Sequence, residues 1–361
     1  MRLGDVVTRR DNNLDSLRLI AASLVILDHA FPIAGRSHIF TGVLGFSLGN
    51  LAVSSFFAMS GYLIAKSWHD DPDVLRYTAK RVLRLLPALI VAALFGALVI
   101  GALTTTLPLG EYLRNPLTRS YVTKNSLVFP IQYSLPGVFA NNPYPSAVNG
   151  SLWSLPIEVM AYGIVLLLGV TGLLRRRAPV FVVFLGVLFV HLRLPTSSHL
   201  GKGVWFYMPV VQMWELFAIF LVGTLAYLYR EKLVLSHTAM FAILGLWAVT
   251  LKTPMGEALY MVAVPYTLLT VGYSTLPWLR RLSAPGDVSY GIYIYAFPVQ
   301  QLLAHIRPGT NPWLAATAAF PITYALAFAS WRLIEKPALR LKRHLPGARQ
   351  PAVSVAPATG A

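Results

Sequence analysis

The sequence predicts an all-α membrane protein that crosses the bilayer about ten times. Of its 361 residues, 56% are hydrophobic and only 12% are charged, whereas roughly 25% of residues are charged in soluble domains. Several apolar runs reach about 20 residues, the length with which a helix crosses a hydrocarbon core of about 30 Å. Most of these runs lack an alternating polar face, which disfavours a soluble protein with a large core.

The ten expected helices follow the apolar runs in order along the chain. They cover about residues 15–33, 43–65, 85–107, 151–174, 178–194, 208–229, 234–251, 255–276, 288–306 and 313–334. If the N-terminus is cytoplasmic, both termini are cytoplasmic and every cytoplasmic segment is basic, as the positive-inside rule requires. We therefore expect one transmembrane domain over residues 1–340 and a basic, disordered cytoplasmic tail over 341–361.

Charge and cysteine content narrow the classes of function. The formal net charge of +16 is explained by basic cytoplasmic loops, so no nucleic-acid partner is expected. The chain has no cysteine, which excludes thiol nucleophiles, disulfides and thiolate metal sites, and no metal site is predicted. No cleavable signal peptide precedes the first apolar run, so we expect the first helix to be retained.

The first expected helix carries charged and titratable groups in the sequence "LDSLRLIAASLVILDHAF". Arg18 and His29 are separated by about three helical turns and share one face, roughly 16 Å apart along the axis. Asp28 lies about 100° away and need not share their site. A charge inside a bilayer span costs roughly 2.5 to 3.5 kcal/mol on insertion scales. The shared face therefore points to protein or water, where His29 could be structural or act as a general base.

A basic cluster, "KRVLRLLP", precedes the third apolar run. Arg81 and Arg84 are three positions apart on one helix face, and Arg76 and Lys80 are four apart. These four cations could be ordinary positive-inside residues. They could also bind phosphates, which arginine contacts in a bidentate manner.

A carboxylate and a long loop are expected on the outer side. Glu158 in "SLWSLPIEVMAY" lies about 10 Å inside its helix, at a depth similar to that of His29, so the two side chains could meet. The preceding loop 108–150 could be part of an acceptor site or an irregular connection. The tyrosines of "SYGIYIYAFPV", from Ser289, are mostly explained by an aromatic belt at the membrane interface.

Six segments together resemble one family, the acyltransferase-3 membrane O-acyltransferases. In order, they are "LDSLRLIAASLVILDHA", "FFAMSGYLIA", "KRVLRLLPA", "SLWSLPIEVMAY", "SYGIYIYAFPV" and "RLIEKPAL". They extend over residues 14 to 339, nearly the whole chain. The chain departs from the pattern at Ala296, where many members have a histidine, so no role of that histidine can apply here.

The resemblance implies an activity and a set of site residues. Such proteins transfer an acyl group, usually acetyl, from cytoplasmic acyl-CoA to a hydroxyl of a glycan, polysaccharide or lipid-linked saccharide outside the bacterial cytoplasmic (inner) membrane. The catalytic pair of the family corresponds to Arg18 and His29. The donor-binding motif corresponds to Arg81 and Arg84, with Lys80 and Arg76 beside them, and the glutamate of the fourth segment corresponds to Glu158.

Two mechanisms and one rival function remain open. His29 could be the general base, with Glu158 orienting its imidazole, or it could carry the acyl group itself; we favour the general base. Arg18, Ser60 and Tyr62 are candidate oxyanion stabilisers. The rival is a transporter or flippase for a lipid-linked glycan, in which the buried charges bind substrate or protons. The sequence predicts no oligomeric state.

Overall fold

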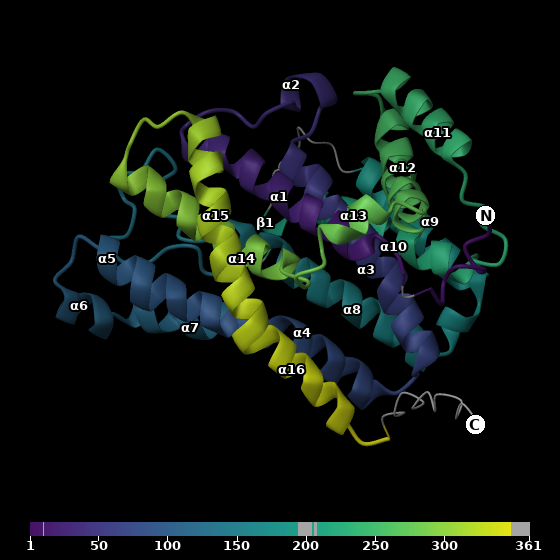
Figure 1. Cartoon of the computed structure of the whole chain (residues 1–361), viewed down its shortest axis with the longest axis horizontal. Helices are drawn as coiled ribbons and strands as arrows, with labels where there is room; N and C mark the ends of the chain where they lie inside the picture. The colour runs from purple at the N-terminus through teal and green to yellow at the C-terminus, as the bar shows by residue number, and fades with distance from the viewer. Residues whose placement is uncertain (10, 194–203, 206–207, 348–361) are drawn as a thin grey trace, which may run out of the picture.

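The computed structural model describes residues 1–9, 11–193, 204–205 and 208–347, and nearly all of its regular structure is helical (Figure 1). The long helices are α1 (Leu14–Ile33), α3 (Leu48–Asp70), α4 (Val74–Leu94), α7 (Pro116–Leu127), α8 (Leu155–Val170), α9 (Arg177–Arg193), α10 (Val210–Leu228), α11 (His237–Val249), α12 (Pro254–Gly272), α14 (Ser289–Ile306) and α15 (Pro312–Ser330). The short elements are α2 (Thr41–Leu44), α5 (Ala102–Thr104), α6 (Leu109–Arg114), α13 (Pro277–Arg281), α16 (Lys336–Arg340), and strands β1 (Val204–Trp205) and β2 (Met208–Pro209), which pair antiparallel.

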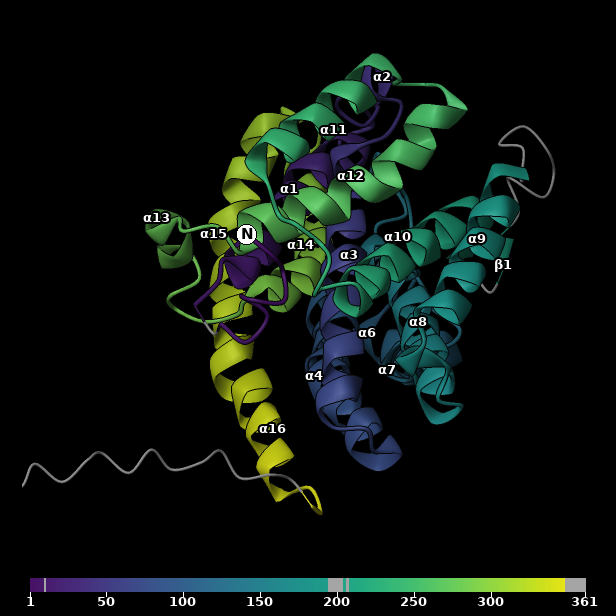
Figure 2. The ribbon, with the colours of Figure 1, turned by 90° about the vertical axis from the view of Figure 1, so that its right-hand side faces the viewer.

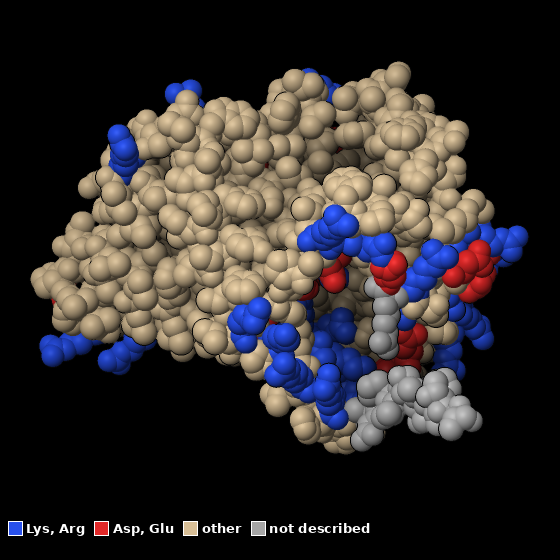
Figure 3. Space-filling view, in the orientation of Figure 1, with Lys and Arg blue, Asp and Glu red and all other residues tan. Residues whose placement is uncertain are grey.

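Six helical stretches of the described residues are long and apolar enough to cross a membrane. They are Leu14–Ile33, Leu48–Asp70, Val74–Thr104, Gly150–Val170, Val210–Leu228 and Pro312–His344. Much of the surface visible in Figure 3 carries no charged side chain, and most of the basic side chains in this view gather along its lower edge, many of them around a hollow near α4 and α16. The chain is therefore a multi-pass helical membrane protein. Helices α9, α11, α12 and α14 occupy the other four expected ranges, while ten crossings and cytoplasmic termini remain predictions.

Two helix boundaries differ from those expected, because capping residues set them. Ser47 accepts a hydrogen bond from the amide of Asn50, so the second long helix starts at Leu48 rather than near residue 43. Asp73 accepts from the amide of Arg76, so the third begins at Val74 rather than near residue 85. The basic cluster therefore lies within α4 rather than before it.

Two segments expected to be irregular contain helices. Residues 108–150 include α6 and α7. The first part of the expected disordered tail is also ordered, since Leu341–His344 forms a 3₁₀ turn that contacts α4. Arg76 donates a hydrogen bond to the carbonyl of Pro346 at 3.2 Å, which ties this segment to α4. Residues 348–361 of the expected tail lie outside the described residues.

The closest helix packing joins α3 and α10, which cross near the middle of the molecule (Figure 2). A Cβ atom on Gly61 would lie 1.9 Å from the carbonyl oxygen of Phe220, and one on Gly223 would lie 2.2 Å from that of Ala58. Thr224 donates a hydrogen bond to the Gly61 carbonyl at 3.2 Å. Small residues allow two backbones to approach in this way inside a membrane. Helix α1 packs against both α3 and α14, which places the first motif at the centre of the fold.

Substituting either contact glycine should destabilise the protein. Gly61→Ala and Gly223→Ala force apart the α3–α10 backbones, and overpacking of this kind costs typically about 1–3 kcal/mol. We expect a lower thermal unfolding midpoint in detergent for both variants. Gly163→Ala on α8 is the matched control, because a Cβ there meets nothing within 4 Å. Equal unfolding temperatures for Gly61→Ala and Gly163→Ala would contradict the close backbone contact between α3 and α10.

Candidate active site

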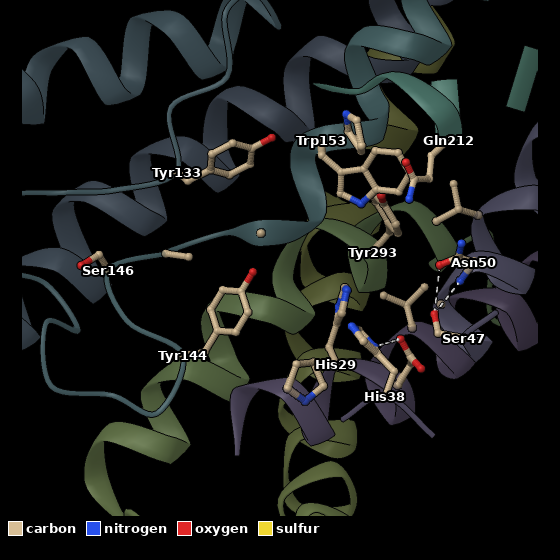
Figure 4. A pocket seen from close by; sticks show the side chains of 18 of the residues that line it. His29, His38, Ser47, Asn50, Tyr133, Tyr144, Ser146, Trp153, Gln212 and Tyr293 are labelled. Carbon is tan, nitrogen blue, oxygen red and sulfur yellow. Dashed lines mark hydrogen bonds and ion pairs between the residues drawn. The ribbon is translucent and has the colours of Figure 1, made fainter. Parts of the chain in front are cut away.

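Two cavities lie along the shared face of α1. The His29 cavity, of about 630 Å³, is lined by Asp28, His29, His38, Asn50, Val53, Tyr144, Trp153, Gln212, Tyr293 and their neighbours (Figure 4). The Arg18 cavity, of about 130 Å³, is lined by Arg18, Val53, Ser60, Arg81, Arg84, Glu158, Tyr162, Tyr293 and others. Val53 and Tyr293 line both cavities and form the junction between them.

Tyr293 is fixed at this junction by hydrogen bonds to the segment that precedes α8. Its hydroxyl donates to the carbonyl of Ser151 at 2.6 Å and lies 2.7 Å from the Ser154 hydroxyl. Tyr290, Tyr293 and Tyr295 are all buried, with at most 8% exposed. The interpretation of these tyrosines as an interfacial belt is therefore wrong, because they face the protein interior from α14.

His29 projects into its cavity from α1 (Figure 4). Its ring packs edge-on against Phe297, with ring centroids 5.3 Å apart. Its Nδ1 atom is buried and has no hydrogen-bond partner among the described residues. The imidazole thus lines a cavity without being held by a carboxylate.

Asp28 and His38, which the sequence did not single out as site residues, also line the His29 cavity. Asp28 is 1% exposed, and its Oδ2 lies 2.7 Å from Nδ1 of His38. The hydrogen bond to Asp28 raises the pKa of His38, although partial burial opposes the charge. His38 follows α1 in a loop that folds back over the helix, and no local sequence pattern indicates that return.

The Arg18 cavity contains an ion network built around Asp287, between α13 and α14. The Asp287 carboxylate lies 2.5 Å from Arg84 and 3.8 Å from Arg18. Arg18 also pairs with Asp15 at 2.7 Å, and Arg84 lies 3.8 Å from the buried Glu335. Burial opposes ionisation of Asp287, but Arg84 and Arg18 hold its pKa at about 2. The two arginines are therefore neutralised within the fold.

The four cations of the basic cluster have unequal surroundings. Lys80 and Arg76 each contact Asp71 at 2.6 Å, and Arg84 belongs to the Asp287 network. Arg81 has no carboxylate partner among the described residues, although one of its Nη atoms donates to the Ser67 hydroxyl at 2.9 Å. Its buried Nε atom has no partner in the described part of the chain. Arg81 is thus the member of the cluster most available to an anion.

Glu158 lines the Arg18 cavity, and not the His29 cavity. It accepts hydrogen bonds from the Tyr162 hydroxyl and, at 3.3 Å, from the Ser60 hydroxyl. The expected approach of Glu158 to His29 is not found among the interactions of the described residues. A similar depth in the membrane does not bring two side chains together when their helices present different faces.

Comparison with known proteins identifies the family. The profile of a family described as an acyltransferase domain, acyltransferase-3, matches residues 11–332. The chain belongs to the acyltransferase-3 family. It is 29% identical over 339 residues to an O-acetyl transferase of Shigella phage Sf6, covering 91% of this chain and 96% of the relative. It is 28% identical over 357 residues to Nodulation protein 10 of Rhizobium leguminosarum bv. viciae, covering 92% and 95%. No solved structure matches significantly.

This acyltransferase is a multi-pass membrane enzyme of the O-acetyltransferase type. Membership in the family implies an acyl donor, and the two cavities offer places for a donor and an acceptor. Within residues 1–9, 11–193, 204–205 and 208–347, no group of three or more histidine, aspartate or glutamate side chains is arranged to hold a metal ion.

Removing the Asp287 charge should destabilise the acyltransferase. Asp287→Asn leaves Arg18 and Arg84 without their shared partner. Because the Asp287 side chain is 15% exposed, the cost should stay below the roughly 3–5 kcal/mol for breaking a fully buried pair. Because the folded pKa of about 2 lies below the ordinary value of 3.8, the stabilisation is present above about pH 4 and is lost as the pH falls toward 2. Thermal unfolding in detergent should therefore show a gap from wild type that is constant near neutral pH and narrows in acid.

The matched control is Asp70→Asn, because the Asp70 side chain is 53% exposed in its pair with Lys66. An exposed pair contributes about 0–1 kcal/mol. Equal unfolding temperatures for the two variants would contradict the central role of Asp287.

Proposed function

We propose that the protein transfers an acetyl group from cytoplasmic acetyl-CoA, or another acyl group from its CoA thioester, to a hydroxyl of a glycan, polysaccharide or lipid-linked saccharide on the opposite side of a bacterial inner membrane. The observation that supports this most is that two neighbouring cavities, one lined by Arg81 and the other by His29, share Val53 and Tyr293 in their walls. Ten crossings with both termini cytoplasmic would place Arg81 on the donor side and His29 on the acceptor side. The charged CoA moiety then need not cross lipid.

On the donor side, the phosphates of CoA bind at Arg81, whose guanidinium has an unused buried donor. Lys80 and Arg76 add positive potential nearby although each pairs with Asp71. Arg84, which also lines the Arg18 cavity, is held in place by its ion pair with Asp287. The thin pantetheine arm extends through the Arg18 cavity, past Arg18 and Glu158, and brings the thioester to the junction at Tyr293.

On the acceptor side, the His29 cavity combines aromatic and amide side chains. Trp153 and Tyr144 offer apolar faces, while Asn50 and Gln212 offer hydrogen-bond donors and acceptors (Figure 4). A concave site with few convergent polar groups on an apolar wall suits a small polar ligand. A sugar unit with its apolar ring face and its hydroxyls fits this chemistry.

His29 then acts as the general base on the acceptor hydroxyl, which attacks the thioester directly. In this proposal both substrates meet at one imidazole, so no acyl-histidine is required, although that route uses the same residue. Glu158 contributes from the Arg18 cavity by holding Tyr162 and Ser60 along the donor path. Glu158 does not orient the imidazole in this mechanism, because it lines the Arg18 cavity and not the His29 cavity.

His29→Ala should abolish acetyl transfer while leaving acetyl-CoA binding unchanged. Loss of a general base costs typically about 10²–10⁴-fold in rate. Radiolabelled acetyl-CoA supplied to membranes that contain the glycan measures transfer, and calorimetry on the purified protein measures donor binding. Wild-type turnover in the variant would remove His29 from the chemistry. Wild-type protein that moves glycan but never labels it would favour the transporter instead.

Arg81→Ala should raise the KM for acetyl-CoA and leave the KM for the glycan nearly unchanged. A hydrogen bond to a charged group contributes about 1.5–3 kcal/mol, which corresponds to roughly 10- to 150-fold in affinity. Lys66→Ala is the control, because this nearby cation is paired with Asp70 on the preceding helix. An unchanged KM for acetyl-CoA in Arg81→Ala would indicate that Arg81 is an ordinary positive-inside residue without a role in donor binding.

A further inference from the structure

The Asp28–His38 pair lines the same cavity as His29 but has no part in the transfer described so far. Asp28 is buried, whereas 44% of the His38 side chain is exposed. Figure 4 shows both imidazoles projecting into the cavity, with a hydrogen bond from His38 to the carboxylate. Two imidazoles therefore line one cavity. Of these two, His38 is hydrogen-bonded to a carboxylate, whereas His29 has no such bond among the described residues.

The fold makes specific room for this pair. A Cβ atom on Gly49, at the start of α3, would lie 2.6 Å from Oδ2 of Asp28. Gly35 adopts a left-handed conformation with φ of 74°, and the amide of Arg36 donates to the Phe31 carbonyl at 2.9 Å. This turn reverses the chain directly after α1 and returns His38 to Asp28.

The two histidines have opposite electrostatic surroundings. A carboxylate on Nδ1 stabilises the imidazolium form of His38 and directs its Nε2–H away from Asp28. The bond to Asp28 accordingly raises the pKa of His38. His29 packs against Phe297 and has no hydrogen bond at Nδ1 in the described structure. An imidazole with an unpaired Nδ1 suits a proton acceptor, and one held by a carboxylate suits a fixed hydrogen-bond donor.

The oxyanion candidates named from the sequence are occupied by other contacts. Arg18 pairs with Asp15 and Asp287. The Ser60 hydroxyl donates to Glu158, and the Tyr62 hydroxyl lies 2.8 Å from that of Tyr273. These interactions lie outside the His29 cavity, where the thioester must react.

We propose that His38, held by Asp28, donates a hydrogen bond from Nε2–H to the carbonyl oxygen of the thioester as that oxygen becomes negative. The inference rests on the proposed function. The acceptor O–H bond breaks and its proton passes to His29, while the acceptor oxygen forms a bond to the acyl carbon. The carbonyl π pair moves onto the oxygen that His38 holds. When the pair returns, the C–S bond breaks and the CoA sulfur takes the proton from His29. His38 keeps its proton throughout.

The test compares His38→Ala, His38→Gln and Asp28→Asn in purified full-length protein, with radiolabelled acetyl-CoA and solubilised envelope glycan of the host. Removing one oxyanion donor lowers kcat typically by about 10²–10³-fold. We expect that loss in His38→Ala, with the KM for acetyl-CoA and for glycan nearly unchanged. His38→Gln should retain more activity, because its amide N–H can still donate. Asp28→Asn should lower kcat as well, since Asp28 is the positioning residue.

The matched control is His305→Ala on α14. The His305 ring contacts Asn142 at 3.3 Å and does not line the His29 cavity, so its kcat should equal that of wild type. Calorimetric binding of acetyl-CoA checks the fold of every variant. If His38→Ala fails to fold, the nearly isosteric Asp28→Asn decides the question.

Two results would overturn the inference: a kcat for His38→Ala or Asp28→Asn within about threefold of wild type, or a change confined to the KM for glycan. The second would make His38 an acceptor-binding residue. Wild-type protein that labels no glycan would instead contradict the proposed function. Activity that depends on His29 but not on His38 would contradict this inference alone.

Discussion

Two arginines that are largely shielded from solvent within an apolar helical bundle require a fixed counter-charge, and Asp287 supplies it. The carboxylate contacts Arg84 on α4 and lies near Arg18 on α1, while the Ser289 hydroxyl donates to its other oxygen at 2.6 Å. Three segments distant in sequence are thereby joined at one point. An uncompensated charge at that depth would cost several kcal/mol, so the relative placement of α1, α4 and α14 depends on this contact.

Two separate carboxylates, Asp287 and Asp71, pair with three of the four cations of the basic cluster. Arg84 is committed to Asp287, and Arg76 and Lys80 share Asp71. Arg76 also reaches the carbonyl of Pro346 and ties the segment after α16 to α4. Arg81 lies over the rings of Tyr77 and Tyr162 and retains a buried donor without a partner in the described structure. Charge alone does not distinguish the four cations, but their contacts do: three are paired with carboxylates, and Arg81 has no carboxylate partner among the described residues.

The close backbone contact between α3 and α10 fixes the position of a helix that lines both cavities. Because Gly61 and Gly223 let these helices approach closely, α3 is held firmly where it faces α1. Val53 and Ser60, on the same helix, then line the cavities in which Arg18 and His29 lie. Tyr293 lines both cavities from α14, and its hydroxyl is restrained by Ser151 and Ser154.

The sequence by itself determined the helical membrane class, the family and the placement of Arg18 and His29 on one face of the first helix. These properties depend on composition, on ordered motifs and on the 3.6-residue repeat, all of which are local. Tertiary structure decided which groups meet. Glu158 and His29 have a similar predicted depth but line different cavities. Tyr293 is buried in the interior, although its segment has the composition of an interfacial aromatic belt. Asp28 and His38 meet because a left-handed turn at Gly35 folds the loop back and Gly49 leaves space for the carboxylate. Contacts made by chain reversal and by packing between distant helices leave no periodic trace in the sequence, so only the folded molecule shows them.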